Sequence, residues 1–210
     1  MLAEFRANKH NFIFANIGCC LSHVSYRAIQ GGIPARQTLS VDKHKKIWDF
    51  GKLTLSYAGP PPQDAPFVVG DLLDVKFLPR LSHAKPKPTK PIPDLRALKT
   101  LAPLHSRVSV VFAERLFDLL SFEEQEDLAA RLAPLLVRRK GAMVFGRQRG
   151  GTAFEATQDE DGLDVFLHSP ESWRVMWAAA FPKGTINVET EVIPRASNPE
   201  SSNLWCLTSD

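Results

Sequence analysis

Two aspartates and a glycine turn are the residues of this 210-residue chain whose types and spacing best suit the binding of a nucleoside. A carboxylate such as Asp42 can accept both hydroxyls of a ribose. Asp71 can accept from an adenine amino group while the neighbouring Leu72 covers the ring. A glycine such as Gly18 lets the backbone approach a ligand closely. Since each follows a short apolar run, the combination indicates a site for an adenosyl cofactor.

Each of these residues also has a purely structural interpretation. Asp42 can cap the helix predicted to follow it, and Asp71 can serve in a turn. Gly18 can occupy any strand-to-helix turn, because the longer dinucleotide-binding pattern Gly-x-Gly-x-x-Gly is absent. Both interpretations stay open at each position taken alone, and the three positions together favour the cofactor.

Other kinds of catalytic or metal site are disfavoured by the motifs. Serine and histidine are adjacent at residues 22–23, 105–106 and 168–169, but no Gly-x-Ser-x-Gly elbow accompanies them. A Gly-x-x-x-x-Gly-Lys loop does not occur, which argues against hydrolysis of nucleoside triphosphates. Three cysteines without a Cys-x-x-Cys pair indicate neither a zinc site nor structural disulfides. We therefore expect no metal, and no catalytic residue is assigned.

The elements that would position these residues alternate along the chain. Short apolar runs and longer segments of helical periodicity are typical of strand–helix units in a largely parallel sheet. The expected strands are residues 12–17, 35–41, 67–70, 107–112 and 142–146, with a closing hairpin of 185–193 and 203–208. The expected helices are residues 21–30 and 42–57, and two more that begin after the caps Ser121 and Ser169. Ligands of such a sheet bind beyond the carboxyl ends of its strands.

The composition predicts one globular domain over residues 1–210. Hydrophobic residues make up 44% of the chain, and a formal charge of +3 gives little reason to expect a nucleic-acid partner. The chain lacks an apolar run of the ~18 residues that cross a membrane, and its start lacks the pattern of a signal peptide. We therefore expect a cytoplasmic protein without membrane contact. Residues 83–93 alternate proline with lysine and are expected to form an exposed loop.

Several blocks of the sequence resemble, in the same order, the class I S-adenosylmethionine-dependent methyltransferases of fungal secondary metabolism. The most specific blocks are FDLLSFEEQEDLAARLAPLL at residues 117–136, HSPESWRVMW at 168–177 and the closing KGTINVETEVI. Shorter coincidences lie in NIGCC, VDKHKKIWDFG, FVVGDLLD and FGRQRGG. The resemblance covers most of the chain. It implies an α/β fold with a Rossmann-like, seven-stranded, mostly parallel sheet whose last strand is antiparallel.

The same resemblance implies S-adenosylmethionine as cofactor and a small-molecule methyl acceptor as partner. Seven residues are assigned to cofactor binding in these terms: Gly18, Cys19, Asp42, Asp71, Leu72, Phe112 and Ala113. The first two would line the methionine part, Asp42 would bind the ribose, and Asp71 with Leu72 the adenine. The last two would end the fourth strand, facing the methyl donor. Because alignment of the acceptor with the methyl group supplies much of the acceleration, a catalytic base is not required.

Departures from the family pattern generate a second hypothesis. Asn16 stands where the family has an acid and Ser22 where it has a glycine, and both changes are expected to weaken cofactor binding. Glu114 and Arg115 replace histidine and small polar residues, and Asp118 stands where another histidine is usual. The first strand also lies close to Met1, which suggests a short N-terminus. The first hypothesis is a methyltransferase acting on a secondary-metabolite-like acceptor. The second is a non-catalytic or truncated methyltransferase-like protein with weakened cofactor binding. We favour the enzyme.

Overall fold

The computed structural model describes residues 1–55, 65–83, 88–89, 91–151, 153–158, 162, 164–195 and 198–209. Its strands are β1 (Phe14–Ile17), β2 (Thr38–Asp42), β3 (Phe67–Val69), β4 (Val110–Ala113), β5 (Met143–Gly150), β6 (Glu155–Gln158), β7 (Asp164–Leu167), β8 (Asn187–Arg195) and β9 (Asn198–Ser209). Its α-helices are α1 (Leu2–Ala7), α2 (His23–Gln30), α3 (Lys45–Leu55), α4 (Phe122–Leu132) and α5 (Pro170–Ala180). Short 3-10 turns include η2 (Ala35–Gln37) and η6 (Phe117–Leu119).

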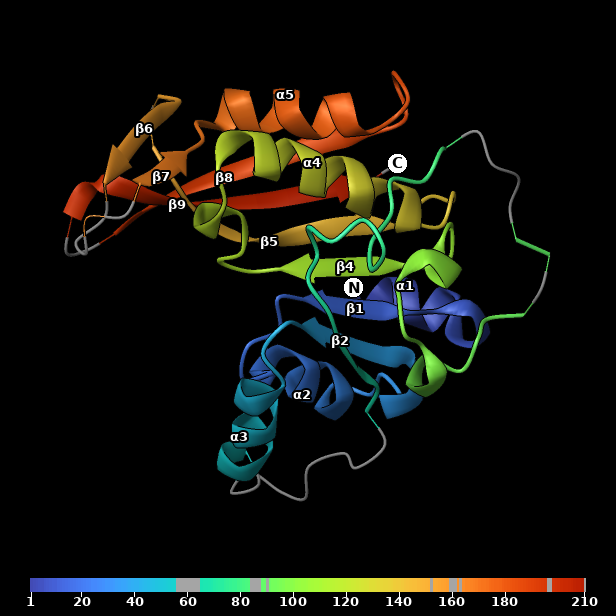
Figure 1. Cartoon of the computed structure of the whole chain (residues 1–210). Coiled ribbons are helices and arrows are strands. Elements are labelled where there is room, and N and C mark those ends of the chain that lie inside the picture. The colour runs from blue at the N-terminus through green and yellow to red at the C-terminus, as the bar shows by residue number, and fades with distance from the viewer. Residues whose placement is uncertain are drawn as a thin grey trace.

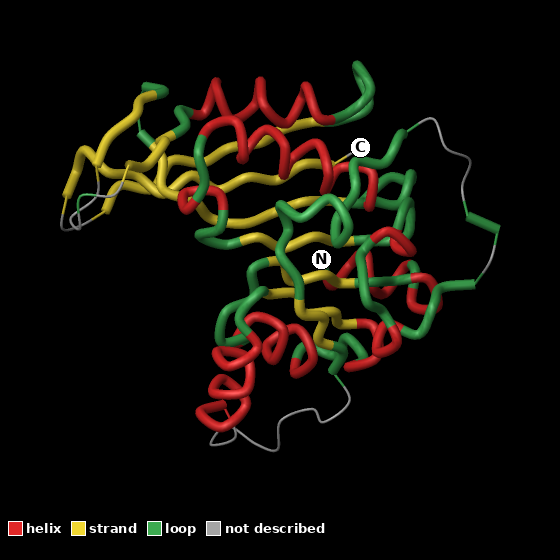
Figure 2. Tube along the Cα trace, viewed as in Figure 1, coloured by secondary structure: helices red, strands yellow, loops and turns green. Residues whose placement is uncertain are grey.

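A seven-stranded sheet in the order β3-β2-β1-β4-β5-β9-β8 forms the centre of the molecule (Figure 1). The five strands from β3 to β5 are parallel to their neighbours, whereas β9 is antiparallel to both β5 and β8. Figure 2 shows the helices gathered around this sheet. The predicted mostly parallel sheet with an antiparallel last strand is confirmed.

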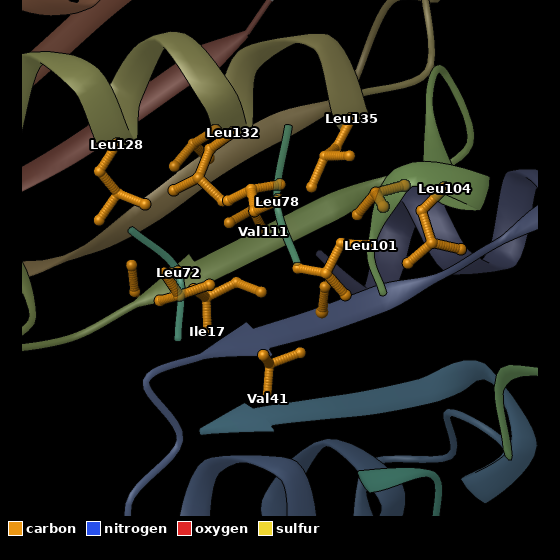
Figure 3. Close-up of a cluster of buried hydrophobic side chains, with 14 of the residues drawn as sticks. Ile17, Val41, Leu72, Leu78, Leu101, Leu104, Val111, Leu128, Leu132 and Leu135 are labelled. Atoms are coloured by element: carbon orange, nitrogen blue, oxygen red, sulfur yellow. The ribbon is translucent and has the colours of Figure 1, made fainter. Parts of the chain in front are cut away.

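Alternating side chains along residues 12–17 enter two separate cores. Ile13, Ala15 and Ile17 belong to the larger core, which includes residues of α4, of α5 and of the segment after β3. Figure 3 shows part of this packing, with Ile17 and Val41 from the sheet and Leu128 from α4. Phe12 and Phe14 belong to a smaller core, against which side chains of α1 and α2 pack. Both faces of the sheet are therefore covered, as period-two alternation of buried strands requires.

Local sequence patterns predicted most of the helices and strands, but pairing between strands far apart in the sequence changed some of their bounds. Residues 35–37, predicted as strand, form the turn η2, and the helix predicted from residue 42 begins at Lys45. The strand predicted at 142–146 continues to Gly150, because β9 pairs with it from Met143 to Gly150. The β6–β7 hairpin was not predicted, and its four described β6 residues are all exposed. Of the predicted loop 83–93, residues 84–87 and 90 lie outside the described part of the chain.

The two helix starts predicted from the caps Ser121 and Ser169 are confirmed. Ser121 accepts from the Glu124 N–H, and the Glu124 carboxylate accepts from the Ser121 N–H, which completes a capping box. Ser169 accepts from the Ser172 N–H at the start of α5. None of the helices described combines the length and apolar character that a membrane crossing requires.

His168 is buried directly before α5 among aromatic rings. Its ring lies 5.4 Å from that of Phe154 and 5.2 Å from that of Trp173, centroid to centroid. Nδ1 forms a hydrogen bond with the Ser172 hydroxyl at 2.9 Å, and Nε2 has no partner among the described residues. Burial lowers the pKa of His168 to about 4, so the ring is neutral in the folded protein near neutral pH.

Replacing His168 is expected to change how stability depends on pH. The folded-state pKa lies below the ordinary value of 6.5, so the unfolded chain binds a proton that the folded protein excludes as pH falls from 6.5 to 4. As pH falls over that window, the free energy of unfolding of wild type should decrease by up to about 3 kcal/mol relative to that of His168→Gln. Urea unfolding of both proteins at a series of pH values measures this difference. Parallel pH profiles would show that His168 does not titrate in this way.

Candidate functional site

A cavity of about 410 Å³ lies at the carboxyl ends of β1, β2, β3 and β4. Four residues predicted from the sequence line it: Gly18, Asp42, Asp71 and Leu72. They are brought together because parallel strands end at the same edge of the sheet. Lys43, His44 and Ile47 extend the lining from the end of β2 into α3. Residues after β4, in η6 and in α4 form another part of the wall: Glu114, Arg115, Leu116, Leu119, Leu120 and Leu128. The cavity therefore has polar groups at the ends of β1 to β3 and a leucine-rich wall beside β4.

The turn after β1 places backbone N–H groups at the end of β2. Gly18 and Cys19 donate to the Val41 carbonyl at 2.9 and 3.0 Å. Gly18 has φ +66°, a left-handed conformation that favours glycine, and a Cβ there would lie 3.0 Å from the Leu116 side chain. Glycine is thus needed for both the turn and the close approach of Leu116.

Asp42 joins two of the cavity-lining segments. One carboxylate oxygen accepts from the Cys20 N–H at 2.9 Å, and the other accepts from the His44 N–H at 2.8 Å. The first contact fixes the turn after β1, and the second fixes the chain entering α3. The capping role considered for Asp42 is wrong, because α3 begins at Lys45 and the carboxylate accepts from the His44 N–H before the helix instead. These two contacts leave room for a ligand, since a carboxylate offers about four lone-pair positions.

Asp71 lies in an exposed turn after β3. Its carboxylate accepts from the Leu73 N–H at 3.0 Å, and the preceding Gly70 N–H donates to the Asp42 carbonyl at 3.2 Å. Leu72 beside it is buried. The turn role considered for Asp71 is present. Its position places a carboxylate next to a leucine at the cavity wall, which is chemistry that suits a purine with an exocyclic amino group.

Cys19, Phe112 and Ala113 are not among the residues that line this cavity. Cys19 is buried and accepts from the Ser22 hydroxyl at 3.5 Å, and burial raises the pKa of its thiol to about 12. Phe112 packs edge-to-face on Phe145 in the smaller core, because alternation turns its side chain to that face. Ala113 is buried in the larger core.

One side chain of β5 binds the loop that follows β4. Gln148, which is buried, donates to the Ala113 carbonyl at 3.0 Å and accepts from the N–H groups of Leu116 and Phe117, each at 3.1 Å. Sequence reasoning missed this residue, because a glutamine within a strand carries no local signal of such a contact. It positions the leucine-rich side of the cavity.

Asn16 and Ser22, two of the departures from the family pattern, are not among the residues that line the cavity. The Asn16 amide donates to the Ser25 hydroxyl at 3.0 Å, and the hydroxyls of Ser25 and Ser40 lie 2.7 Å apart. This buried network ties β1 and β2 to α2. Ser22 has φ +65°, which explains why the family has glycine at this position. The asparagine therefore has a structural partner in this chain, and the serine carries backbone strain.

Charged residues dominate the loop after β4. Glu114 pairs with Arg147 at 2.6 Å, and Asp118 pairs with Arg115 at 2.6 Å and with Arg149 at 2.9 Å. Glu114 and Arg115 line the cavity. The sequence offered a signal for them, namely their departure from the family pattern, but it did not indicate which side chains pair. Among the described residues no cluster of three His, Cys, Asp or Glu side chains could hold a metal ion.

Sheet order and strand-end cavity together define the class I fold of S-adenosylmethionine-dependent methyltransferases. The chain is 22% identical over 178 residues to the O-methyltransferase phiE of Fungal sp. (strain ATCC 74256). The match covers 84% of this chain and 51% of that protein, so the chain spans about half the length of this relative. No protein-family model matches the chain. The resemblance predicted from the sequence blocks is confirmed.

Solved structures of methyltransferases share the fold. One is the Burkholderia thailandensis 1,6-didemethyltoxoflavin-N1-methyltransferase with bound S-adenosylhomocysteine, at a TM-score of 0.61 and 9% identity over 99% of this chain and 75% of that one. A Methanosarcina mazei S-adenosylmethionine-dependent methyltransferase matches at a TM-score of 0.60 and 8% identity, over 94% of this chain and 91% of that one. At such low identity these structures establish the fold alone.

Substituting glycine for Ser22 is expected to stabilise the protein. A left-handed conformation costs a non-glycine residue about 1–2 kcal/mol, and glycine adds about 0.5–1 kcal/mol of chain entropy to the unfolded state. Ser22→Gly should therefore raise the free energy of unfolding by about 0.5–1 kcal/mol, measured by urea unfolding. Ser22→Ala is the matched control, because it keeps the Cβ and the strain. An equal gain in both variants would show that the backbone conformation is not the cause.

Proposed function

We propose that this chain binds S-adenosylmethionine in the cavity at the ends of β1 to β4 and transfers its methyl group to a small-molecule acceptor. The observation that carries the proposal is the convergence of Gly18, Asp42 and Asp71 on one cavity of about 410 Å³. This volume is in the range of small-molecule sites, about 300–1,000 Å³. The cofactors of the solved relatives support the same ligand, since one holds S-adenosylmethionine and others hold S-adenosylhomocysteine.

The residues present fit that cofactor. Asp42 keeps lone pairs for ribose hydroxyls beyond its two backbone contacts, and Asp71 with Leu72 offers an acceptor beside an apolar surface. Gly18 keeps the turn after β1 free of a side chain. When bound, the cofactor supplies an electrophilic methyl group. The chain's own contribution is to bind, to orient and to exclude water, with the leucines after β4 covering the acceptor side.

We also propose that the methyl acceptor is a small, apolar molecule of the secondary-metabolite kind. It is supported by the likeness to a fungal O-methyltransferase and by Leu116, Leu119 and Leu120 in the cavity wall. A non-catalytic form with weakened cofactor binding is the second candidate, because Asn16 and Ser22 depart from the family pattern. The positions of Asn16 and Ser22 outside the cavity lining favour the active form. One domain, a cytoplasmic location and no nucleic-acid partner stay predictions of the sequence.

Calorimetric titration with S-adenosylhomocysteine tests the proposal. Wild type is expected to bind, and Asp42→Ala and Asp71→Asn to bind about tenfold or more weakly, because hydrogen bonds to charged groups contribute about 1.5–3 kcal/mol each. Asp74→Asn is the matched control for Asp71. Asp74 accepts from the Lys76 N–H in a similar turn three residues further on but is not among the cavity-lining residues.

Two results would contradict the proposal. Folded wild type that binds neither S-adenosylmethionine nor S-adenosylhomocysteine at millimolar concentration would remove its basis. An equal loss of affinity in Asp71→Asn and Asp74→Asn would show that the cavity is not where the ligand binds. Thermal unfolding of every variant establishes that it is folded under the conditions of the titration.

A further inference from the structure

Arg115 presents a cation to the cavity from the loop after β4. It lines the cavity, and its side chain is 42% exposed. Its φ is +52°, and its N–H donates to the Arg147 carbonyl at 2.8 Å. The backbone at this position is therefore held by β5, and the direction in which the side chain leaves it is fixed.

Asp118 is the buried carboxylate that binds the guanidinium of Arg115. Its side chain is 1% exposed, and its Oδ2 accepts from the Nε groups of Arg115 and Arg149 at 2.6 and 2.9 Å. Two arginines thus share one carboxylate. A planar guanidinium held through Nε still directs its outer fork, one N–H from each terminal nitrogen, away from the tether, where its charge can meet a ligand.

The surroundings of Arg115 leave that charge available to a ligand. Its terminal nitrogens have no hydrogen-bond partner in the part of the chain that the structure describes. The nearby carboxylate of Glu114 is paired with Arg147 at 2.6 Å, with His23 4.0 Å away. Of the other charged groups of the lining, Asp42 ends β2, Lys43 follows it, and Asp71 follows β3.

Leucines surround the cation on the same side of the cavity. Leu116 and Leu120 line the wall, and Leu119 is 73% exposed although it also lines the cavity. A guanidinium beside apolar side chains favours a ligand with an apolar body and a carboxylate, because the fork of N–H groups matches the two carboxylate oxygens.

We propose that Arg115 binds a carboxylate in this cavity and that Asp118 is the positioning residue that orients it. The inference rests on the proposed function, and it names a chemical group that the site recognises. The carboxylate has two potential sources, an apolar acceptor and the methionine end of the cofactor. A binding experiment with one arm for each source distinguishes them.

The acceptor arm uses 2-naphthoate and its uncharged analogue 2-naphthamide, titrated in the presence and absence of S-adenosylhomocysteine. The cofactor arm uses S-adenosylhomocysteine and 5′-methylthioadenosine, which lacks the amino-acid part. Arg115→Gln removes the charge. Arg174→Gln is the matched control, because the Arg174 side chain has a similar exposure of 43% and lies on α5.

Arg115→Gln is expected to lose about tenfold in affinity for one carboxylate ligand and to keep its affinity for the uncharged analogue in the same arm, whereas Arg174→Gln should change neither. A selective loss for 2-naphthoate assigns the carboxylate to the acceptor, and a selective loss for S-adenosylhomocysteine assigns it to the cofactor. Asp118→Asn should lower the affinity for the same carboxylate ligand relative to the affinity for its uncharged analogue. A merely structural role would reduce stability without moving that ratio.

Unchanged ratios in Arg115→Gln for both arms would overturn the inference. Binding of 5′-methylthioadenosine by wild type and by Arg115→Gln reports on the proposed function independently of the carboxylate. If wild type binds neither S-adenosylhomocysteine nor 5′-methylthioadenosine, the proposed function fails. The ratio of the affinities for 2-naphthoate and 2-naphthamide, measured without either nucleoside, then still decides whether Arg115 binds a carboxylate.

Discussion

The Asp42 carboxylate is the interaction on which the candidate site depends. It links the turn after β1, through Cys20, to the chain entering α3, through His44. The backbone of the same residue accepts from Gly70 after β3. Three strand ends are therefore connected through one residue, and their order in the sheet keeps them adjacent. A ligand at this edge meets groups whose positions are set before it arrives, which reduces the ordering cost of binding.

Sequence reasoning succeeded where the signal was local. The strands around residues 12–17 and 67–70, the caps Ser121 and Ser169, and the buried aromatics of α5 follow from apolar periodicity and cap chemistry. The gathering of Gly18, Asp42 and Asp71 at one edge follows from the parallel order of the strands. Long-range pairing had no such signal. It lengthened β5 against β9 and placed Gln148 under the loop after β4.

Side-chain direction was the other limit of sequence reasoning. Phe112 and Ala113 end β4 as predicted, but one side chain enters the smaller core and the other the larger core, whereas the following three residues line the cavity. Asn16 likewise faces Ser25 under α2. A one-residue change along a strand reverses the face that a side chain occupies, so a motif position alone does not decide what reaches a ligand. The charged loop after β4 holds three of the departures from the family pattern, Glu114, Arg115 and Asp118.

A crystal structure of the chain grown with S-adenosylhomocysteine tests the central claim most directly. The account predicts the ligand in the cavity at the ends of β1 to β4, with its ribose hydroxyls at Asp42 and its adenine beside Asp71 and Leu72. A ligand bound elsewhere on the molecule, or bound in this cavity without contact to either aspartate, would contradict the account.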